Sequence, residues 1–177
     1  MKILIFLFFF FPISIFSQVG ESYKSFLHSD FADFFHTAEI KRTPYRNGEL
    51  REIKTGAFQD YITIYFYTDT VSLTVHEASL EIDRSWIEDE STAEFARDLV
   101  KSFLLDLIPA ADQSRAMPAG DLLFNRKATT NKFALDLMDV FNNKQDSTSH
   151  QFSKCTVVLD NSKKEDKTFF RLRIAEK

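Results

Sequence analysis

The sequence predicts an α+β protein in which amphipathic helices pack on a mainly antiparallel sheet of five to seven strands. The clearest strand is predicted at residues 61–67, where isoleucine, threonine and aromatic side chains alternate between two faces. The clearest helix is predicted at residues 91–108, where apolar residues recur every three or four positions. The predicted order, a helix, four or five strands, two helices and two final strands, is that of an α+β domain.

The first 17 residues have the features of a secretory signal peptide. Lys2 precedes an apolar run at residues 3–16, which is too short to cross the roughly 30 Å hydrocarbon core of a bilayer, and Ser17 is a small residue at the expected cleavage point. Ile15, at the third position before that bond, leaves the exact bond open, and an uncleaved anchor is the alternative. We expect residues 18–177 to form a single exported domain, periplasmic or extracellular, with no stable membrane span after cleavage.

Charge and composition argue against several classes of protein. Cleavage would remove one of the 22 basic residues and leave 21 against 26 acidic residues, a net charge of −5. The longest basic runs are pairs, so we expect no nucleic acid partner. Cys155 is the only cysteine, so the chain has no internal disulfide and no cysteine near the cleavage point to carry a lipid. We expect Cys155 to be a small buried apolar residue; a reactive or intermolecular thiol is the alternative.

The sequence contains no motif for catalysis or cofactor binding. Its four glycines are too scattered for a phosphate-binding loop, and no serine stands between glycines as in a nucleophile elbow. The histidines fall in four different predicted elements, without a His-Glu-x-x-His motif: His28, His36, His76 and His150. Glu81 and Asp83 share one strand face, a spacing that is common on solvated strands. We therefore expect no catalytic residue, no metal and no cofactor.

Two elements are predicted before the strand at residues 61–67. Residues 21–36 carry apolar side chains mostly on one side, which predicts an amphipathic helix; the alternative is a break at Ser29-Asp30, which would cap a second short helix. Residues 39–53 hold Asn47-Gly48 between two runs of mixed polarity, which predicts a hairpin with a type I′ turn. Pro44 lacks an amide donor, so its arm of the hairpin is expected at a sheet edge.

A second strand and a long helix are predicted after residues 61–67. Residues 71–76 alternate apolar and polar side chains, which is typical of a half-buried strand. The apolar positions change from odd to even at His76-Glu77, which predicts a bulge or short turn before another extended segment. Residues 91–94 have the form of a capping box, so a helix is expected to start there and to end at Pro109.

The C-terminal part is predicted to contain a loop, a helix and a pair of strands. Residues 109–120 are expected to be the longest loop, followed by a short strand at residues 121–126. Thr130 or Asn131 is expected to cap a helix that ends at Asn142-Asn143, and a loose polar connection then leads to His150. Two final strands are predicted, joined by a charged turn, at residues 152–160 and 168–175.

The polar side of the strand at residues 61–67 is the candidate partner-binding face. It comprises Tyr61, Thr63, Tyr65 and Tyr67, and tyrosine favours interfaces because it joins a rigid apolar ring to a polar tip. If helices packed on both sides of the sheet, the same row would instead form a second core layer. We expect this second arrangement, because amphipathic helices are predicted both before and after the strand.

These features favour a non-catalytic, exported protein of the cell envelope that binds another envelope protein or assembles with it. One alternative is a carrier whose small apolar ligand lies between the phenylalanine-rich helices and the sheet. A further alternative is an enzyme whose site is assembled from distant residues, which would need at least two ionisable groups converging on a pocket.

Overall fold

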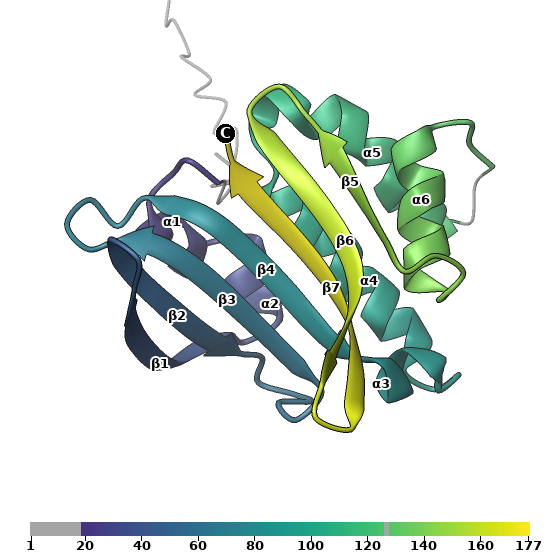
Figure 1. The fold of residues 1–177 in the computed structure, drawn as a ribbon, viewed down its shortest axis with the longest axis horizontal. Coiled ribbons are helices and arrows are strands. Elements are labelled where there is room, and N and C mark those ends of the chain that lie inside the picture. The colour runs from purple at the N-terminus through teal and green to yellow at the C-terminus, as the bar shows by residue number, and fades with distance from the viewer. Residues whose placement is uncertain (1–18, 126–127) are drawn as a thin grey trace, which may run out of the picture.

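The computed structural model describes residues 19–125 and 128–177. These residues form a seven-stranded sheet with the strand order β1-β2-β3-β4-β7-β6-β5 (Figure 1). Every neighbouring pair of strands is antiparallel, and helices pack against the sheet. The predicted α+β class is confirmed. The expected signal peptide, residues 1–17, lies outside the described residues.

The elements follow the chain in two groups of strands separated by four helices. The strands are β1 (Ala38–Tyr45), β2 (Gly48–Lys54), β3 (Ile62–Asp69), β4 (Val75–Asp83), β5 (Ser147–Gln151), β6 (Cys155–Lys164) and β7 (Lys167–Glu176). The helices are α1 (Tyr23–Leu27), α2 (Asp30–Phe34), α3 (Arg84–Glu88), α4 (Ala93–Leu107), α5 (Ala110–Asn125) and α6 (Lys132–Phe141). Strands β1 to β4 form one meander and β5 to β7 a second, and the two meanders join where β4 pairs with β7.

The helices lie behind the sheet in Figure 1, on one of its faces. The ring of Phe26 in α1 lies 4.4 Å from that of Phe66 in β3, and the ring of Phe141 in α6 lies 5.3 Å from that of Phe170 in β7. Strand alternation and the register place Phe66 and Phe170 on the same face. The core therefore occupies one layer between this face and the helices, and no described helix covers the other face.

The N-terminal elements largely follow the prediction, with one correction. The helix breaks at Ser29, whose Oγ accepts the Ala32 amide hydrogen at 3.1 Å, and Pro44 lies in the edge strand β1. The predicted type I′ turn at Asn47-Gly48 is wrong. Gly48 already pairs with Tyr45, so the turn is one residue earlier, and the left-handed residue is Arg46 (φ 52°).

The segment at residues 71–76 is also mostly a turn rather than the predicted strand. Asp69 Oδ1 accepts the backbone N–H groups of Val71 and Ser72, each at 2.8 Å, and β4 begins only at Val75. The predicted bulge is confirmed: Val75 pairs with Thr68 and Glu77 with Tyr67, so His76 is the extra residue between them.

The helical region differs most from the prediction. The predicted long helix is confirmed as α4, but the capping box at residues 91–94 is wrong: the N-cap residue is Thr92, whose side chain makes no capping hydrogen bond, and Ser91 Oγ donates to Asp89 instead. Helix α3 was not predicted. The predicted loop at residues 109–120 and strand at residues 121–126 are wrong, since α5 spans this part of the chain up to Asn125 with Pro118 inside it.

The C-terminal elements follow the prediction except for one strand. Asn131 caps α6 by accepting the Ala134 amide hydrogen at 3.0 Å, and Asn142 ends the helix. The final strand pair is present as β6 and β7. The connection leading to His150 is not loose, because it contains the edge strand β5, paired with β6.

Candidate functional site

The face of the sheet that no described helix covers is the candidate site, and we call it the open face. Alternation along the strands places the following side chains on it: Tyr45, Leu50, Glu52, Lys54, Thr63, Tyr65, Tyr67, Glu77, Ser79, Glu81, Val158, Asp160, Lys164, Lys167, Phe169, Arg171 and Arg173. Of the four residues predicted to form the partner-binding face, three thus lie together here. Tyr61 precedes β3 and stacks on Trp86, with ring centroids 6.4 Å apart.

The tyrosines of β3 are half-exposed and do not form a second core layer, because the described helices all lie on the opposite face. Tyr65 stands between Glu52 of β2 and Ser79 of β4. Burial, and then the charges of Glu81 and Glu52, raise the pKa of Tyr65 to about 12. The phenol therefore stays protonated at neutral pH, and it can donate a hydrogen bond to a partner.

A second aromatic group occupies the corner of the open face at the β1–β2 turn. The rings of Tyr45 and Tyr67 meet edge to face with centroids 5.5 Å apart. The Arg46 guanidinium lies over both rings, 4.9 Å from Tyr45 and 5.5 Å from Tyr67. This corner thus presents an exposed guanidinium that packs against two tyrosine rings.

In the ion pairs on the open face, the basic side chain is more exposed than the acidic one. Lys164 binds Glu81 at 2.5 Å, and their side chains are 47% and 6% exposed. The basic side chain is also the more exposed one in three further pairs: Lys167 with Asp83, Arg171 with Asp160, and Arg173 with Glu77. A molecule that approached this face would therefore meet the cations first.

The tip of the β6–β7 hairpin lies near the end of the sheet at which β3 begins (Figure 1), and it carries two of these cations. Lys164 Nζ lies 5.4 Å from the Tyr65 ring, and Lys167 Nζ lies 5.9 Å from the Tyr61 ring. Each lysine also binds a carboxylate, Glu81 or Asp83, the two that share one strand face in the sequence. Because each carboxylate has its own lysine, the two do not form an isolated acid pair of the kind used in glycoside hydrolysis.

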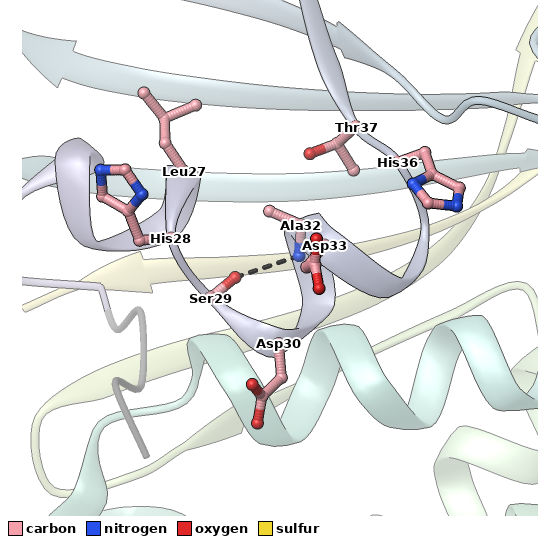
Figure 2. Close-up of a pocket in the computed structure, with 8 residues that line it drawn as sticks. All are labelled: Leu27, His28, Ser29, Asp30, Ala32, Asp33, His36 and Thr37. Carbon is pink, nitrogen blue, oxygen red and sulfur yellow. Dashed lines mark hydrogen bonds between the residues drawn. The ribbon is translucent and has the colours of Figure 1, made fainter. Parts of the chain in front are cut away.

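A polar cavity of about 560 Å³ lies at the corner between α1 and α2. Figure 2 shows that its ionisable side chains diverge, with His28 and His36 at opposite ends and Asp30 directed away from both. Within residues 19–125 and 128–177, no three histidine, cysteine or carboxylate side chains gather closely enough to hold a metal ion. This cavity therefore offers no converging groups for catalysis.

An apolar groove of about 400 Å³ lies between α2 and α4, on the outside of the helical layer. Phe31, Phe34, Phe35 and Leu105 line it, and Phe34 is 72% exposed. The carrier hypothesis placed a ligand between the helices and the sheet, but there the side chains fill the core. The groove is the apolar surface that a small ligand could use instead.

Cys155 is fully buried at the start of β6. Its Sγ lies 3.9 Å from Asp112 Oδ2, and burial together with the Asp112 charge raises the pKa of the thiol to about 12. A thiol that is buried and protonated at neutral pH is a poor nucleophile.

Comparisons of the chain with protein-family models, with curated proteins and with solved structures find no match. In the described parts of the chain, no helix has the length and apolar character needed to cross a membrane. The function of the open face is therefore inferred from its own chemistry.

Proposed function

We propose that the protein is an exported, non-catalytic binding protein of the cell envelope that recognises an acidic surface of a partner protein through its open face. One observation carries this proposal: tyrosines and exposed lysine and arginine side chains gather on a sheet face that no described helix covers.

The residue types on the open face are those that contribute most to protein recognition. Tyrosine and arginine are enriched at interfaces and among the residues that dominate binding energy. The basic ends of the ion pairs are exposed although the whole chain carries a net charge of −4. Because the basic member of each of these ion pairs is the more exposed one, the open face favours an acidic partner and orients its approach.

A pair of matched double variants tests the binding face. Lys164→Gln with Lys167→Gln removes two exposed cations from the open face, whereas Lys24→Gln with Lys144→Gln removes two exposed cations elsewhere. Tagged proteins, checked for folding by circular dichroism, are incubated with a solubilised envelope fraction. We expect the wild type and the control to retain one acidic protein that high salt releases, and the open-face variant to retain at least about tenfold less.

Two results would contradict this proposal. Equal retention by the two double variants would show that the open face is not the binding site. Loss of binding in both would show that total charge, and not this face, attracts the partner.

The proposed export is tested separately by the mass of the protein recovered outside the cytoplasm. We expect a mature chain that begins after Ser17, because the apolar segment before it has the form of a signal peptide. Full-length protein that stays in the cytoplasm would exclude an envelope partner.

The α2–α4 groove supports a second candidate function, the binding of a small apolar ligand. Phe34 is exposed at the rim of this groove beside Phe31, Phe35 and Leu105, so that a small apolar ligand would bury apolar surface there. Native mass spectrometry of the purified protein should then show an added mass that Phe34→Ser abolishes. The absence of any added mass after gentle purification from envelopes would remove this candidate.

A further inference from the structure

The two edges of the sheet differ in how they are protected against pairing with another strand. Edge strand β1 contains Pro44, the cations Lys41 and Arg42, and a register shift between Glu39 and Lys41. Proline, exposed charge and bulges are the devices by which sheet edges avoid association. Edge strand β5, Ser-Thr-Ser-His-Gln, has no proline or formally charged residue and pairs with β6 in an uninterrupted register.

The outward hydrogen-bonding groups of β5 can be assigned from its pairing with β6. Asn161 N–H donates to the Asp146 carbonyl, and Phe152 N–H donates to the Cys155 carbonyl. Because bonded positions alternate along an antiparallel strand, the amides of Ser147, Ser149 and Gln151 are directed away from β6. Gln145 Nε2 donates to the Ser147 carbonyl at 2.8 Å. Within the described part of the chain, the outward N–H and carbonyl of Ser149 make no hydrogen bond.

Helix α6 lies along this edge and contacts β5 through Asp136 and Phe133. Ala134, Leu137 and Phe141 of α6 are buried in the core, and a spacing of about 100° per residue places Lys132, Leu135 and Asp139 on the opposite flank. Leu135 is 44% exposed. Asp136 binds His150 of β5 at 3.0 Å, so α6 lies along the edge strand and its outer flank extends the edge.

We propose that β5 pairs antiparallel with β5 of a second copy of this chain, about a two-fold axis at Ser149, to form one continuous sheet. This register sets Ser149 opposite Ser149 of the second copy and Ser147 opposite its Gln151, so that the outward N–H groups of each copy donate to the outward carbonyl groups of the other. The helical layers of the two copies then lie on the same side of the joined sheet.

The composition of the edge favours a second copy as the occupant. An isologous contact places each residue near its own copy or a close neighbour, so a formally charged strand would repel itself. The five residues of β5 carry no formal charge, and Lys132 and Asp139 give the flank opposite charges. The proposal is independent of the partner at the open face, because it uses different residues.

Cross-linking tests the register. Cα atoms in a hydrogen-bonded antiparallel pair are about 5.5 Å apart, within the range that a disulfide spans. Ser149→Cys should therefore give a disulfide-linked dimer on mild oxidation, while the buried Cys155 stays unreacted. Ile40→Cys, an exposed position on the protected edge β1, is the matched control and should stay monomeric.

Sedimentation equilibrium tests the association without cross-linking. The wild type and Ile40→Lys should form dimers whose fraction rises with protein concentration, whereas Ser149→Lys places two like charges at the axis and should weaken dimerisation at least about tenfold. A wild-type protein that stays monomeric at every concentration would overturn the proposal. Equal dimerisation of Ser149→Lys and the wild type, with unchanged circular dichroism, would also overturn it.

Discussion

Asp112 and Arg51 are charged residues that the fold buries almost completely, and each joins segments that are distant in sequence. Asp112, in the first turn of α5, accepts hydrogen bonds from Ser153 and Lys154 in the β5–β6 turn. Arg51, in β2, binds carboxylates on two strands. Buried charges of this kind stabilise a fold only while their partners are present.

Asp112→Asn should lower the free energy of unfolding at neutral pH by about 1–3 kcal/mol, because an amide donor then faces backbone donors. Burial alone would raise the pKa of Asp112, but the hydrogen bonds from the Ser153 side chain and from the Lys154 and Ser153 backbone hold it below its ordinary value. A lowered pKa stabilises the fold above the unfolded value and loses this effect as the pH falls through the folded value.

Urea unfolding of the wild type and Asp112→Asn at a series of pH values measures this effect. The difference between the two proteins should be largest near pH 7 and should shrink below about pH 4. A difference that stayed constant down to pH 2 would show that the Asp112 carboxylate is not responsible.

Arg51→Met should destabilise the protein by about 3–5 kcal/mol, since it leaves two carboxylates without their buried partner. The Arg51 guanidinium donates to Glu39 at 2.9 Å, to Glu49 at 2.6 Å and to Thr68 at 2.9 Å. Arg42→Met is the control, because Arg42 also binds Glu39 but is half-exposed, and its loss should cost less than about 1 kcal/mol. Similar urea midpoints for the two variants would contradict the assigned role of Arg51.

The residues of the open face were only partly predictable. Alternation in the sequence identified the tyrosine row, because it depends on neighbours in one strand. It could not identify Lys164 and Lys167, because their positions over Tyr65 and Tyr61 depend on β7 pairing with β4. The side that the helices cover likewise follows from packing and not from the strand itself.

Among the elements, the β1–β2 hairpin shows how a correct prediction can rest on the wrong residue. Gly48 suits this hairpin because the backbone of β3 passes close to it, not because of a left-handed turn. A Cβ atom at Gly48 would lie 2.1 Å from the Thr68 carbonyl oxygen.

Gly48→Ala should therefore destabilise the protein by about 1–3 kcal/mol, as expected when an atom is forced into a packed site. Asn47→Ala changes the neighbouring turn residue without this clash and should alter stability by less than about 0.5 kcal/mol. Thermal unfolding followed by circular dichroism compares the two. A larger loss of stability for Asn47→Ala than for Gly48→Ala would show instead that the turn requires the Asn-Gly pair.

Most elements with a clear apolar period were predictable, with residues 71–76 as the exception, whereas α5 and β5 were not. Helix α5 contains Pro118, Gly120 and several alanines, which together resemble a loop. In the structure Ala116 and Ala119 are buried, and a Cβ at Gly120 would lie 3.2 Å from a Leu105 methyl carbon, so the small residues allow α5 to approach α4 closely. Strand β5 has no apolar face to detect, because its inward residue His150 binds Asp136.

In the whole molecule, the two meanders share one sheet and one helical layer, which predicts a single cooperative unfolding transition. Trp86, the only tryptophan, reports on the first meander, and the accessibility of the Cys155 thiol reports on the second. Both signals should change at the same urea concentration.

Leu172→Ala provides a second test of this coupling. Leu172 lies in β7, is fully buried and pairs with Leu80 and Leu159, so its truncation should cost about 2–5 kcal/mol and shift both midpoints equally. Val158→Ala on the open face should shift both midpoints much less. Separate transitions in the wild type would show that the meanders unfold independently.

The position of β7 also determines when the protein can fold. Strand β7 follows the other six described strands in the chain but lies between β4 and β6 in the sheet. While the chain is being synthesised, β4 and β6 therefore have unpaired edges and the core beneath them is open until residues 167–176 emerge. Long-range strand pairing is slow, and unpaired apolar edges promote aggregation. The newly made polypeptide therefore passes through an aggregation-prone interval, in which holding the chain unfolded would protect it.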